Sequence, residues 1–409
     1  MAQNVVNALA AKTCRREVVD SHLLVLNAGS SSPKFTVFRR EPAGWHPDVR
    51  GQIDGIGTAP RFSARDDGGV RIADDAVDAG LDGRGAIDVL GTWLRTRFGN
   101  ASVAGIGHRV VHGGPRHAGP TIVTPEVLAD LRTLIPLAPL HQPYNLAAID
   151  AAFERLPGVP QVACFDTSFH RGQPAVAEVV PLPRELCRGG VQRYGFHGLS
   201  YEYISSVLPD VAPEIANGRV IVAHLGSGAS LCAMNDRRSV DSTLGFTTLD
   251  GLCMGTRPGA IDSGVILYLF QTLQLSARDV EAVLYKKSGL LGISGISNDM
   301  RDLLPSSEPG ARLALDYFVY RAVKEIGALA AVLGGIDGLV FTAGIGENSD
   351  EIRRRIIESS AWLGLEIDAD ANKRHGPRIT RAGSRVSAWA IPTNEELIIA
   401  RHTSALLRQ

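Results

Sequence analysis

Cysteine is scarce in this sequence, and so are the spacings that would give it a structural role. The 409 residues include 5 cysteines, at positions 14, 164, 187, 232 and 253, and no two form a Cys-x-x-Cys pair. An odd, scattered set excludes a disulfide framework and offers no pattern for a structural metal. We therefore expect a protein of a reducing compartment and predict a cytoplasmic location.

Long apolar runs and a large net charge of either sign are also missing. No run reaches the roughly 18 apolar residues that a membrane-spanning helix needs. Residues 1–21 lack the apolar core of a signal peptide, so we interpret them as an N-terminal extension. The formal net charge is −1, and no overall field attracts nucleic acid or an anionic membrane. We expect neither as a partner.

The common phosphate-binding signatures do not occur. No Gly-Lys-Ser/Thr sequence forms a Walker A motif, and no Gly-x-Gly-x-x-Gly follows a predicted strand. The usual sequence signals of P-loop and Rossmann nucleotide binding are therefore absent, and no Ser-His-Asp nucleophile is evident.

What is present fits a soluble globular α/β protein. The composition is 44% hydrophobic and 21% charged, and the length suggests two or three domains. Apolar periodicity predicts helices over residues 86–98 and 144–156, and apolar runs predict strands over 103–107 and 161–166. Strands that alternate with helices favour an α/β fold, in which chemistry gathers at strand ends.

Two stretches far apart share one pattern of apolar run, Gly/Ser turn and apolar run. The first covers residues 23–38 and carries Lys34 in its turn; the second covers residues 219–234. Each predicts an antiparallel hairpin, and the repetition suggests duplicated domains. A third apolar run, 339–342, predicts a strand that feeds a Gly-rich turn at 344–348, before a helix from about residue 350. Such turns can present N–H groups to phosphate.

Several cations and carboxylates lie where ordinary surface residues are unusual. Arg109, His141, His197 and Arg257 each stand close to glycine or proline in the chain. An arginine fork suits carboxylate or phosphate, and Asp166 and Glu395 are candidates for magnesium or for orienting the arginines. Taken singly, each has an ordinary explanation: a surface charge, a structural histidine, or an acid at the first turn of a helix.

Seven blocks, taken in order, resemble the acetate kinase family. They are Asn-Ala-Gly-Ser-Ser-Ser at 27–32, Gly-His-Arg-Val-Val-His-Gly-Gly at 107–114, Phe-Asp-Thr at 165–167, Tyr-Gly-Phe-His-Gly at 194–198, Asp-Met-Arg at 299–301, Gly-Ile-Gly-Glu-Asn at 344–348 and Pro-Thr-Asn-Glu-Glu at 392–396. The resemblance runs from about residue 23 to 403. It implies an actin-like, sugar-kinase-like (ribonuclease H-like) fold of two duplicated domains around a cleft, working as a homodimer. We expect residues 22–168 plus 394–409 to form one domain and 169–393 the other.

The resemblance also implies a role for each matching residue. Catalysis would rest on Arg109, His141, Asp166, His197 and Arg257, and Asn27 and Glu395 would serve Mg²⁺, or Mn²⁺ in its place. Arg109 would also hold acetate, in a pocket with Val111, Leu140, Phe196 and Thr248. ATP and its phosphates would contact Ser30, Ser32, Lys34, His224, Leu225, Gly226, Ser227, Gly228, Asp299, Met300, Arg301, Gly344, Ile345, Gly346, Glu347 and Asn348.

The implied activity is reversible transfer of the γ-phosphoryl group of ATP to acetate, which gives acetyl phosphate and ADP. A carboxylate is already ionised, so its attack needs cations that offset repulsion rather than a general base. Ser227, Pro33 and Thr248 depart from the family's usual Asn, aliphatic residue and Pro. Two alternatives stay open: a kinase for propionate or another short acyl chain, and an actin-like ATP-binding protein without transfer.

Overall fold

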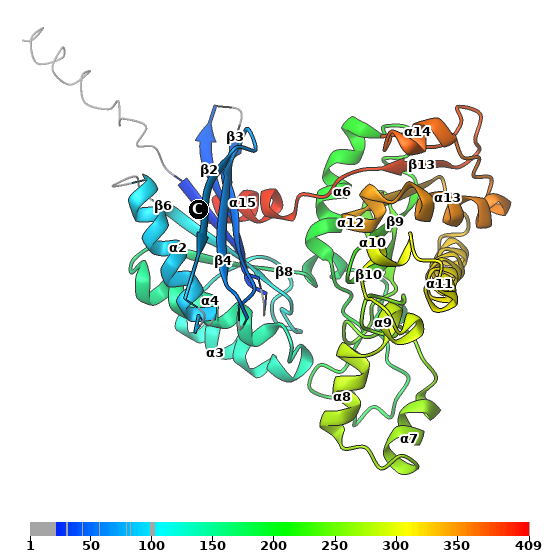
Figure 1. The fold of residues 1–409 in the computed structure, drawn as a ribbon, viewed down its shortest axis with the longest axis horizontal. Helices are drawn as coiled ribbons and strands as arrows, with labels where there is room; N and C mark the ends of the chain where they lie inside the picture. Colours follow the sequence, from blue (N-terminus) through cyan, green and yellow to red (C-terminus); the bar gives the residue numbers. More distant parts are fainter. Residues whose placement is uncertain are drawn as a thin grey trace, which may run out of the picture.

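Two β-sheets, each flanked by helices, make up the two halves of the molecule (Figure 1). The structure is a computed structural model and describes residues 22–29, 32–42, 44–56, 58–78, 80–81, 83–98 and 103–408. Ser30, expected at the phosphates, lies outside the described residues.

The first sheet has eight strands in the order β5-β4-β3-β2-β1-β6-β8-β7. Its strands are β1 (His22–Asn27), β2 (Lys34–Glu41), β3 (Gly44–Asp54), β4 (Arg61–Asp66), β5 (Arg71–Ala76), β6 (Val103–Val110), β7 (Thr121–Ile122) and β8 (Gln161–Phe165). Helices α2 (Gly83–Phe98) and α4 (Gln142–Arg155) cover one face, where Leu24 and Phe35 are buried against Ile87 and Ala148. Alternate residues of β1 point the other way, because successive strand side chains face opposite sides.

The second sheet has five strands in the order β11-β10-β9-β12-β13. They are β9 (Arg219–Leu225), β10 (Ala229–Asn235), β11 (Arg238–Ser242), β12 (Gly338–Thr342) and β13 (Ser387–Ala390). The long helix α11 (Pro309–Leu333) buries Phe318 and Ile326 in the same core as Ile221 and Leu231 of this sheet.

The two sheets repeat one topology, which confirms the predicted duplication. In the first, β3, β2 and β1 are antiparallel neighbours, and β1, β6 and β8 are parallel. In the second, β11, β10 and β9 are antiparallel, and β9, β12 and β13 are parallel. The two predicted hairpins are the β1–β2 and β9–β10 pairs, so they occupy equivalent places.

Two helices lie where the halves meet. After β13 the chain crosses back to the first half as α15 (Glu395–Leu406; Figure 1). There Ile398 and Ile399 pack with Leu23 and Val25 of β1, and Leu199 of α6 (Gly198–Val211) joins the same cluster. Tyr201 and Ile204 of α6 pack instead with Val222 and Met234 of the second sheet. Helix α6 therefore contacts both sheets.

The remaining short elements complete the two halves. They are α3 (Pro125–Thr133), η1 (Ile135–Leu137), η2 (Ser168–His170), α5 (Ala175–Glu178), α7 (Ser263–Gln271), α8 (Ala277–Lys286), α9 (Gly289–Ser294), α10 (Met300–Leu303), α12 (Ala343–Asn348), α13 (Asp350–Ser359), η3 (Ala361–Leu363) and α14 (Ala369–Lys373). The predicted helices at 86–98, 144–156 and from about 350 are confirmed as α2, α4 and α13.

The predicted Gly-rich turn at residues 344–348 is wrong in form, because this segment is the helix α12. The chain turns within one residue, Ala343, which has a left-handed φ of 64°. The carboxylate of Glu347 then accepts a hydrogen bond from the Ala343 N–H at 2.9 Å, and the Asn348 side chain donates to the Gly344 carbonyl. These bonds satisfy the ends of a helix too short to be visible in sequence.

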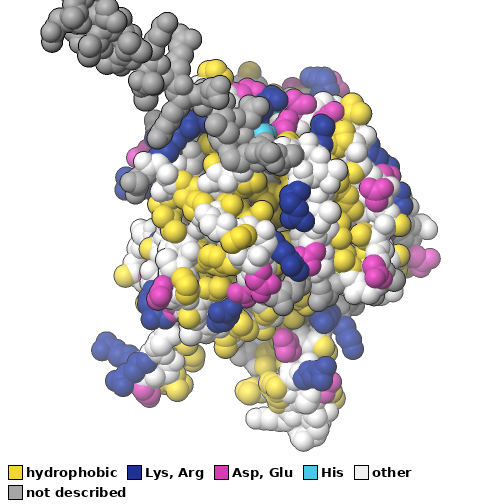
Figure 2. All heavy atoms as spheres, turned by 90° about the vertical axis from the view of Figure 1, so that its left-hand side faces the viewer, with side chains coloured by type: hydrophobic (Ala, Val, Ile, Leu, Met, Phe, Trp, Pro, Cys, Tyr) yellow, Lys and Arg dark blue, Asp and Glu magenta, His cyan; other side chains and the backbone are white. Residues whose placement is uncertain are grey.

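No one charge dominates the face of the molecule that Figure 2 shows. On the face in Figure 2, hydrophobic side chains gather over the middle, and Lys, Arg, Asp and Glu are spread around them. Of the described helices, none combines the length and the apolarity that crossing a membrane requires.

Candidate active site

Arg109 and Asp166 form a two-bond ion pair at the carboxyl ends of neighbouring parallel strands. Arg109 lies near the end of β6 and Asp166 directly follows β8. Arg109 Nε and Nη2 donate to the two Asp166 oxygens at 2.9 and 2.7 Å. Burial opposes the charged form of Arg109, but Asp166 and Glu395 outweigh it and raise its pKa above the usual value. The guanidinium is therefore held rigidly and stays charged.

Glu395 and Asn27 complete the first half's contribution. Arg109 Nη1 donates to Asn27 Oδ1 at 3.4 Å, and Glu395 Oε2 lies 3.7 Å from Arg109 Nε. Burial raises the pKa of Glu395, Arg109 lowers it, and Asp166 raises it again, to about 7. Two carboxylates and an amide oxygen thus converge on one arginine, and the carboxylates repel each other.

Arg257 and His197 come from the second half and meet over Gly228. A β-carbon on Gly228 would lie 2.7 Å from Arg257 Nη2 and 3.3 Å from His197 Nε2, so only glycine leaves both groups this close. His197 caps α6 with a left-handed φ of 59°. The N–H of Gly198 donates to the Asp166 carbonyl at 2.8 Å, which ties the start of α6 to the end of β8.

Arg257 has no carboxylate partner among the described residues. Its side chain donates to the Thr248 carbonyl at 2.8 Å, and burial lowers its pKa to about 10. The loop that carries it is fixed through the Gly255 N–H, which donates to the Ser227 carbonyl at 3.1 Å. A half-buried cation without a counterion favours binding of an anion.

The arginines from both halves act on the same histidines. Burial, then Arg257 and Arg109, lowers the pKa of His141 to about 4. Burial, then His224, Arg109 and Arg257, holds the pKa of His197 well below 6.5. The rings of His197 and His224 stack with centroids 4.1 Å apart. Of the five residues expected to be catalytic, Arg109 contacts Asp166, and Arg257 lies with His197 around Gly228. His141 lies near enough for the charges of Arg257, Arg109 and Asp166 to shift its pKa.

The expected acyl pocket is partly assembled. Val111 and Phe196 are buried in one apolar cluster that also contains Ala138. Leu140 is half-buried next to His141, and Thr248 is half-buried with its carbonyl on Arg257.

The three segments expected to hold ATP line one cavity of about 530 Å³. Among the predicted residues, Gly226, Ser227, Asp299, Met300, Arg301, Gly344, Ile345 and Asn348 line it. Asp299 caps α10 and accepts a hydrogen bond from the Arg301 side chain at 2.5 Å, so this ion pair is already formed without a ligand. Sequence reasoning missed Leu290, Asn298, Leu304, Ser349, Asp350 and Glu351, which also line the cavity.

Other predicted nucleotide residues lie outside that lining. His224, Leu225, Gly228 and Gly346 lie on neighbouring segments, and Ser32 and Lys34 belong to the first half. Lys34 is exposed, and its charge lowers the pKa of Glu395. The Glu347 carboxylate accepts hydrogen bonds from two backbone groups, the Ala343 N–H and the Thr393 N–H, the latter at 3.0 Å. It links α12 to the segment that leads into α15.

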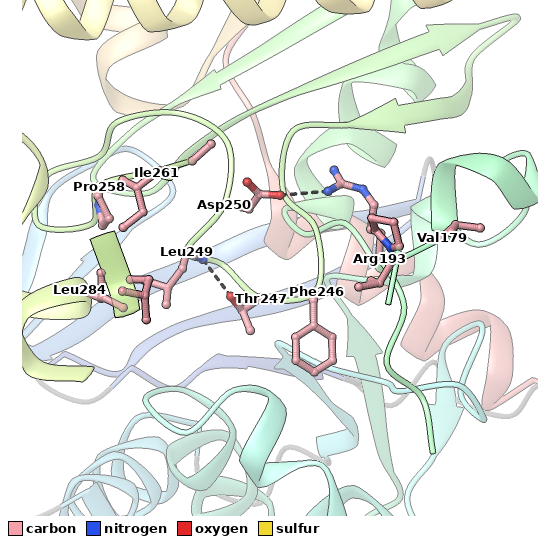
Figure 3. Close-up of a pocket in the computed structure, with 14 residues that line it drawn as sticks. Val179, Arg193, Phe246, Thr247, Leu249, Asp250, Pro258, Ile261 and Leu284 are labelled. Carbon is pink, nitrogen blue, oxygen red and sulfur yellow. Dashed lines mark hydrogen bonds and ion pairs between the residues drawn. The ribbon is translucent and has the colours of Figure 1, made fainter. Parts of the chain in front are cut away.

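A second hollow, of about 400 Å³, is lined by Thr247, Leu249 and Pro258, the chain neighbours of Thr248 and Arg257 (Figure 3). Arg193 and Asp250 point toward each other at its edge, 2.9 Å apart. The remaining lining is mostly apolar and includes Val179, Phe246, Ile261, Ile266 and Leu284.

Comparisons with known proteins agree along nearly the whole chain. Residues 22–401 match the sequence pattern of the acetokinase family. An acetate kinase of Rhodopseudomonas palustris is 53% identical over 385 residues, 93% of this chain and 97% of the relative. An acetate kinase of Rickettsia akari is 43% identical over 392 residues, which are 94% of this chain and 99% of the relative. Among solved structures, a propionate kinase of Francisella tularensis subsp. tularensis superimposes with a TM-score of 0.88 at 35% identity, covering 94% and 99%. Acetate kinase of Porphyromonas gingivalis gives 0.83 at 35% identity, covering 95% and 100%.

Proposed function

Because the chain belongs to the acetokinase family, it is a phosphotransferase with acetate as acceptor, and we propose that the groups around Arg109 and Arg257 carry out the transfer. Its fold is the actin-like fold of acetate and propionate kinases. The alternative of an actin-like protein without transfer is not favoured.

One arrangement supports the assignment of residues: Arg109 is paired with Asp166 in the first half, and Arg257 and His197 meet over Gly228 in the second. The charges of both arginines also lower the pKa of His141 and of His197. Arg109 is already neutralised by Asp166, whereas Arg257 lacks a counterion. We assign Arg257 to the phosphoryl group in transit and Arg109 to the acetate carboxylate. The acetate oxygen attacks the γ-phosphorus in line, and the bond to the β-phosphate oxygen breaks. His197 and Arg257 donate to the equatorial oxygens as charge develops on them.

The residues near Arg109 also fit a divalent cation. Mg²⁺ prefers oxygen ligands and usually takes one or two carboxylates plus substrate phosphates. Glu395 and Asn27 supply such oxygens, and burial, with the nearby Asp166 charge adding to it, raises the pKa of Glu395, so a bound cation would favour its ionised form. When bound, Mg²⁺ would offset charge between the phosphates of ATP. We propose Glu395 and Asn27 as its protein ligands, with Mn²⁺ as a substitute.

Nucleotide and acyl group have separate places in this proposal. The cavity between Gly226, Asp299 and Gly344 has the polar loops that a nucleotide requires. Acetate would place its methyl against Val111 and Phe196, with Leu140 and Thr248 as the other walls.

A homodimer is the proposed assembly. Helix α7 is strongly apolar, yet it buries none of its residues in the described structure, and Val265, Leu267, Tyr268 and Phe270 are exposed. In Figure 1, α7 and α8 project from the second half. A helix with an unpartnered apolar surface marks an interface, and a second copy of the chain is the commonest occupant. Sedimentation of the wild type and of Leu267→Glu with Phe270→Glu tests this.

Domain limits and location complete the proposal. We place the domain boundaries near residues 168 and 394, because α15 packs on the first sheet although β13 belongs to the second. The free thiols of Cys164, Cys187, Cys232 and Cys253 support a reducing cytoplasm.

The deciding experiment traps acyl phosphate with hydroxylamine, using ATP, Mg²⁺ and a panel of acetate, propionate and butyrate. We expect hydroxamate from acetate, dependent on ATP and enzyme. A purified, folded protein that forms none with any acid would overturn the proposal.

A further inference from the structure

The Ser230 hydroxyl lies between the His197 ring and the Tyr201 hydroxyl, where it can determine which ring nitrogen of His197 carries the proton. Its hydroxyl oxygen lies 2.8 Å from His197 Nδ1 and 2.5 Å from the Tyr201 hydroxyl. Ser230 and Tyr201 have no exposed surface. The backbone also links these residues, because the Tyr201 N–H donates to the His197 carbonyl at 3.1 Å. Neither side chain touches the place assigned to the phosphoryl group.

Counting donors decides the direction of these hydrogen bonds. Among the described residues, Ser230 is the only partner of the Tyr201 hydroxyl. If His197 Nδ1 carried the proton, Ser230 would accept from it and donate to Tyr201, and the buried Tyr201 proton would have no acceptor. In the opposite direction, Tyr201 donates to Ser230 and Ser230 donates to Nδ1. Every donor is then used, and a buried unpaired donor is avoided.

His224 repeats the arrangement on the stacked ring. Its Nδ1 lies 2.9 Å from the hydroxyl of Ser200, which is also fully buried. Ser200 has no other side-chain partner among the described residues, so the same count makes its hydroxyl donate to Nδ1. Two imidazolium rings 4.1 Å apart would repel each other, which is consistent with two neutral rings.

We propose that the chain Tyr201–Ser230 fixes His197 as the neutral tautomer with its proton on Nε2, and that Ser200 does the same for His224. His197 Nε2 is the atom beside Gly228 and Arg257. The histidine then meets the phosphoryl oxygens as an N–H donor, whereas the other tautomer would present a lone pair that repels them. Tyr201, Ser230 and Ser200 are positioning residues; this inference rests on the proposed role of His197.

The test reads the tautomer directly. Protein labelled with ¹⁵N-histidine gives long-range ¹H–¹⁵N spectra that distinguish the two protonated nitrogens, and His197→Gln identifies the His197 signal. We expect an Nε2-protonated ring in the wild type. In Ser230→Ala we expect a mixture of tautomers and a fall in kcat of about 10- to 100-fold with little change in KM, less than the loss for removing a catalytic donor outright. In Tyr201→Phe, kcat should lie between those of the wild type and of Ser230→Ala, because the Ser230 hydroxyl can still donate to His197 Nδ1.

The matched control is Ser360→Ala. Ser360 is as buried as Ser230, and its hydroxyl makes no hydrogen bond in the described part of the chain. We expect this variant to keep wild-type kcat. A wild-type His197 protonated on Nδ1 would overturn the proposal, as would a Ser230→Ala variant with unchanged tautomer and kcat. Because the spectrum needs no turnover, it separates this inference from the proposed function.

Discussion

The two halves of the molecule repeat one strand order, yet the arginines they bring to the site are held in opposite ways. Arg109, on a parallel strand of the first sheet, has both Asp166 oxygens within hydrogen-bond distance, and its pKa is raised. Arg257, on the loop between β11 of the second sheet and α7, has only the Thr248 carbonyl as a hydrogen-bond partner among the described residues, and burial lowers its pKa. The first is part of the framework, and the second keeps its charge available for the substrate.

The effects of the two arginines on stability and on catalysis should therefore be separable. A buried ion pair is costly to break, because the partner left behind is an uncompensated charge. A half-buried cation without a counterion, such as Arg257, also costs stability, and its removal relieves that cost. Alanine at the two arginines should therefore give two different phenotypes.

Arg109→Ala is expected to have the largest effect. It leaves the buried Asp166 carboxylate unpaired, which should lower the free energy of unfolding by about 3–5 kcal/mol, and it removes the proposed acetate ligand. Urea unfolding and the hydroxamate assay measure the two losses. Arg132→Ala, which breaks an exposed pair with Asp150, serves as the control and should change neither. Unchanged stability in Arg109→Ala would show that Asp166 is not neutralised by this arginine.

Arg257→Ala should lose activity without losing stability. Removing one donor to the transition-state charge typically costs about 10²-fold or more in turnover. The free energy of unfolding should stay within about 1 kcal/mol of the wild type, because no carboxylate is left unpaired. The same two measurements apply, again beside Arg132→Ala. Near-normal turnover in a folded variant would remove Arg257 from the catalytic residues and end the contrast between the arginines.

The strand ends that carry this site could be predicted from local patterns in the sequence, whereas the roles of its residues were implied only by the family resemblance. The hairpin turns, Arg109 near a strand end and Asp166 after one all follow from apolar runs that stop at polar residues. The lining of the proposed ATP cavity could be predicted only in part. Leu290, Asn298 and Asp350 approach Gly226 through tertiary packing, which no single segment records.

Other features had no signal in the sequence at all. Helix α12 depends on the left-handed backbone of Ala343. Alanine rarely adopts this conformation, so the sequence gives no sign of it. Ser230 and Tyr201 act through His197 rather than on the substrate, and only the three-dimensional contacts reveal them. The opposite pKa shifts of the two arginines, upward for Arg109 and downward for Arg257, likewise depend on what surrounds each one.

Glu395→Gln should have a smaller effect, confined to metal use and to pH. The apparent Mg²⁺ requirement should rise by about 10-fold or more, while Gln is still tolerated at the helix start. The folded pKa of Glu395 is raised, so between pH 4.5 and about 7 the folded state binds more protons than the unfolded state. Wild-type stability without ligands should therefore fall as pH rises through this window, by up to about 1.4 kcal/mol per unit.

The control for Glu395 is its neighbour on the same helix turn, Glu396→Gln, which alters the helix dipole equally. We expect the pH-dependent loss of stability to disappear only in Glu395→Gln, measured by urea unfolding from pH 4.5 to 8. If the Mg²⁺ requirement is unchanged in this variant, Glu395 is only an acid at a helix start.

Thr248→Pro should have the smallest effect, on the choice of acyl chain. Thr248 is the one proposed wall that differs from the proline implied by the family resemblance, and its side chain is not ring-locked. A methyl or methylene contact is worth about 1–3 kcal/mol, or roughly 10- to 200-fold in selectivity. We therefore expect the wild type to use acetate and propionate, with acetate preferred or comparable, and to use butyrate poorly, because Val111, Leu140 and Phe196 remain.

The substitution leaves Arg257 in place, which makes it a clean test of the pocket. Proline keeps the carbonyl that accepts from Arg257, and the Thr248 N–H that it removes makes no hydrogen bond in the described structure. kcat for acetate should then change little, while kcat/KM for propionate falls by about 10-fold at most. The measurement is kcat/KM for acetate, propionate and butyrate in both proteins. If butyrate exceeds acetate in the wild type, the three apolar walls do not limit chain length, and the acceptor is a longer acid.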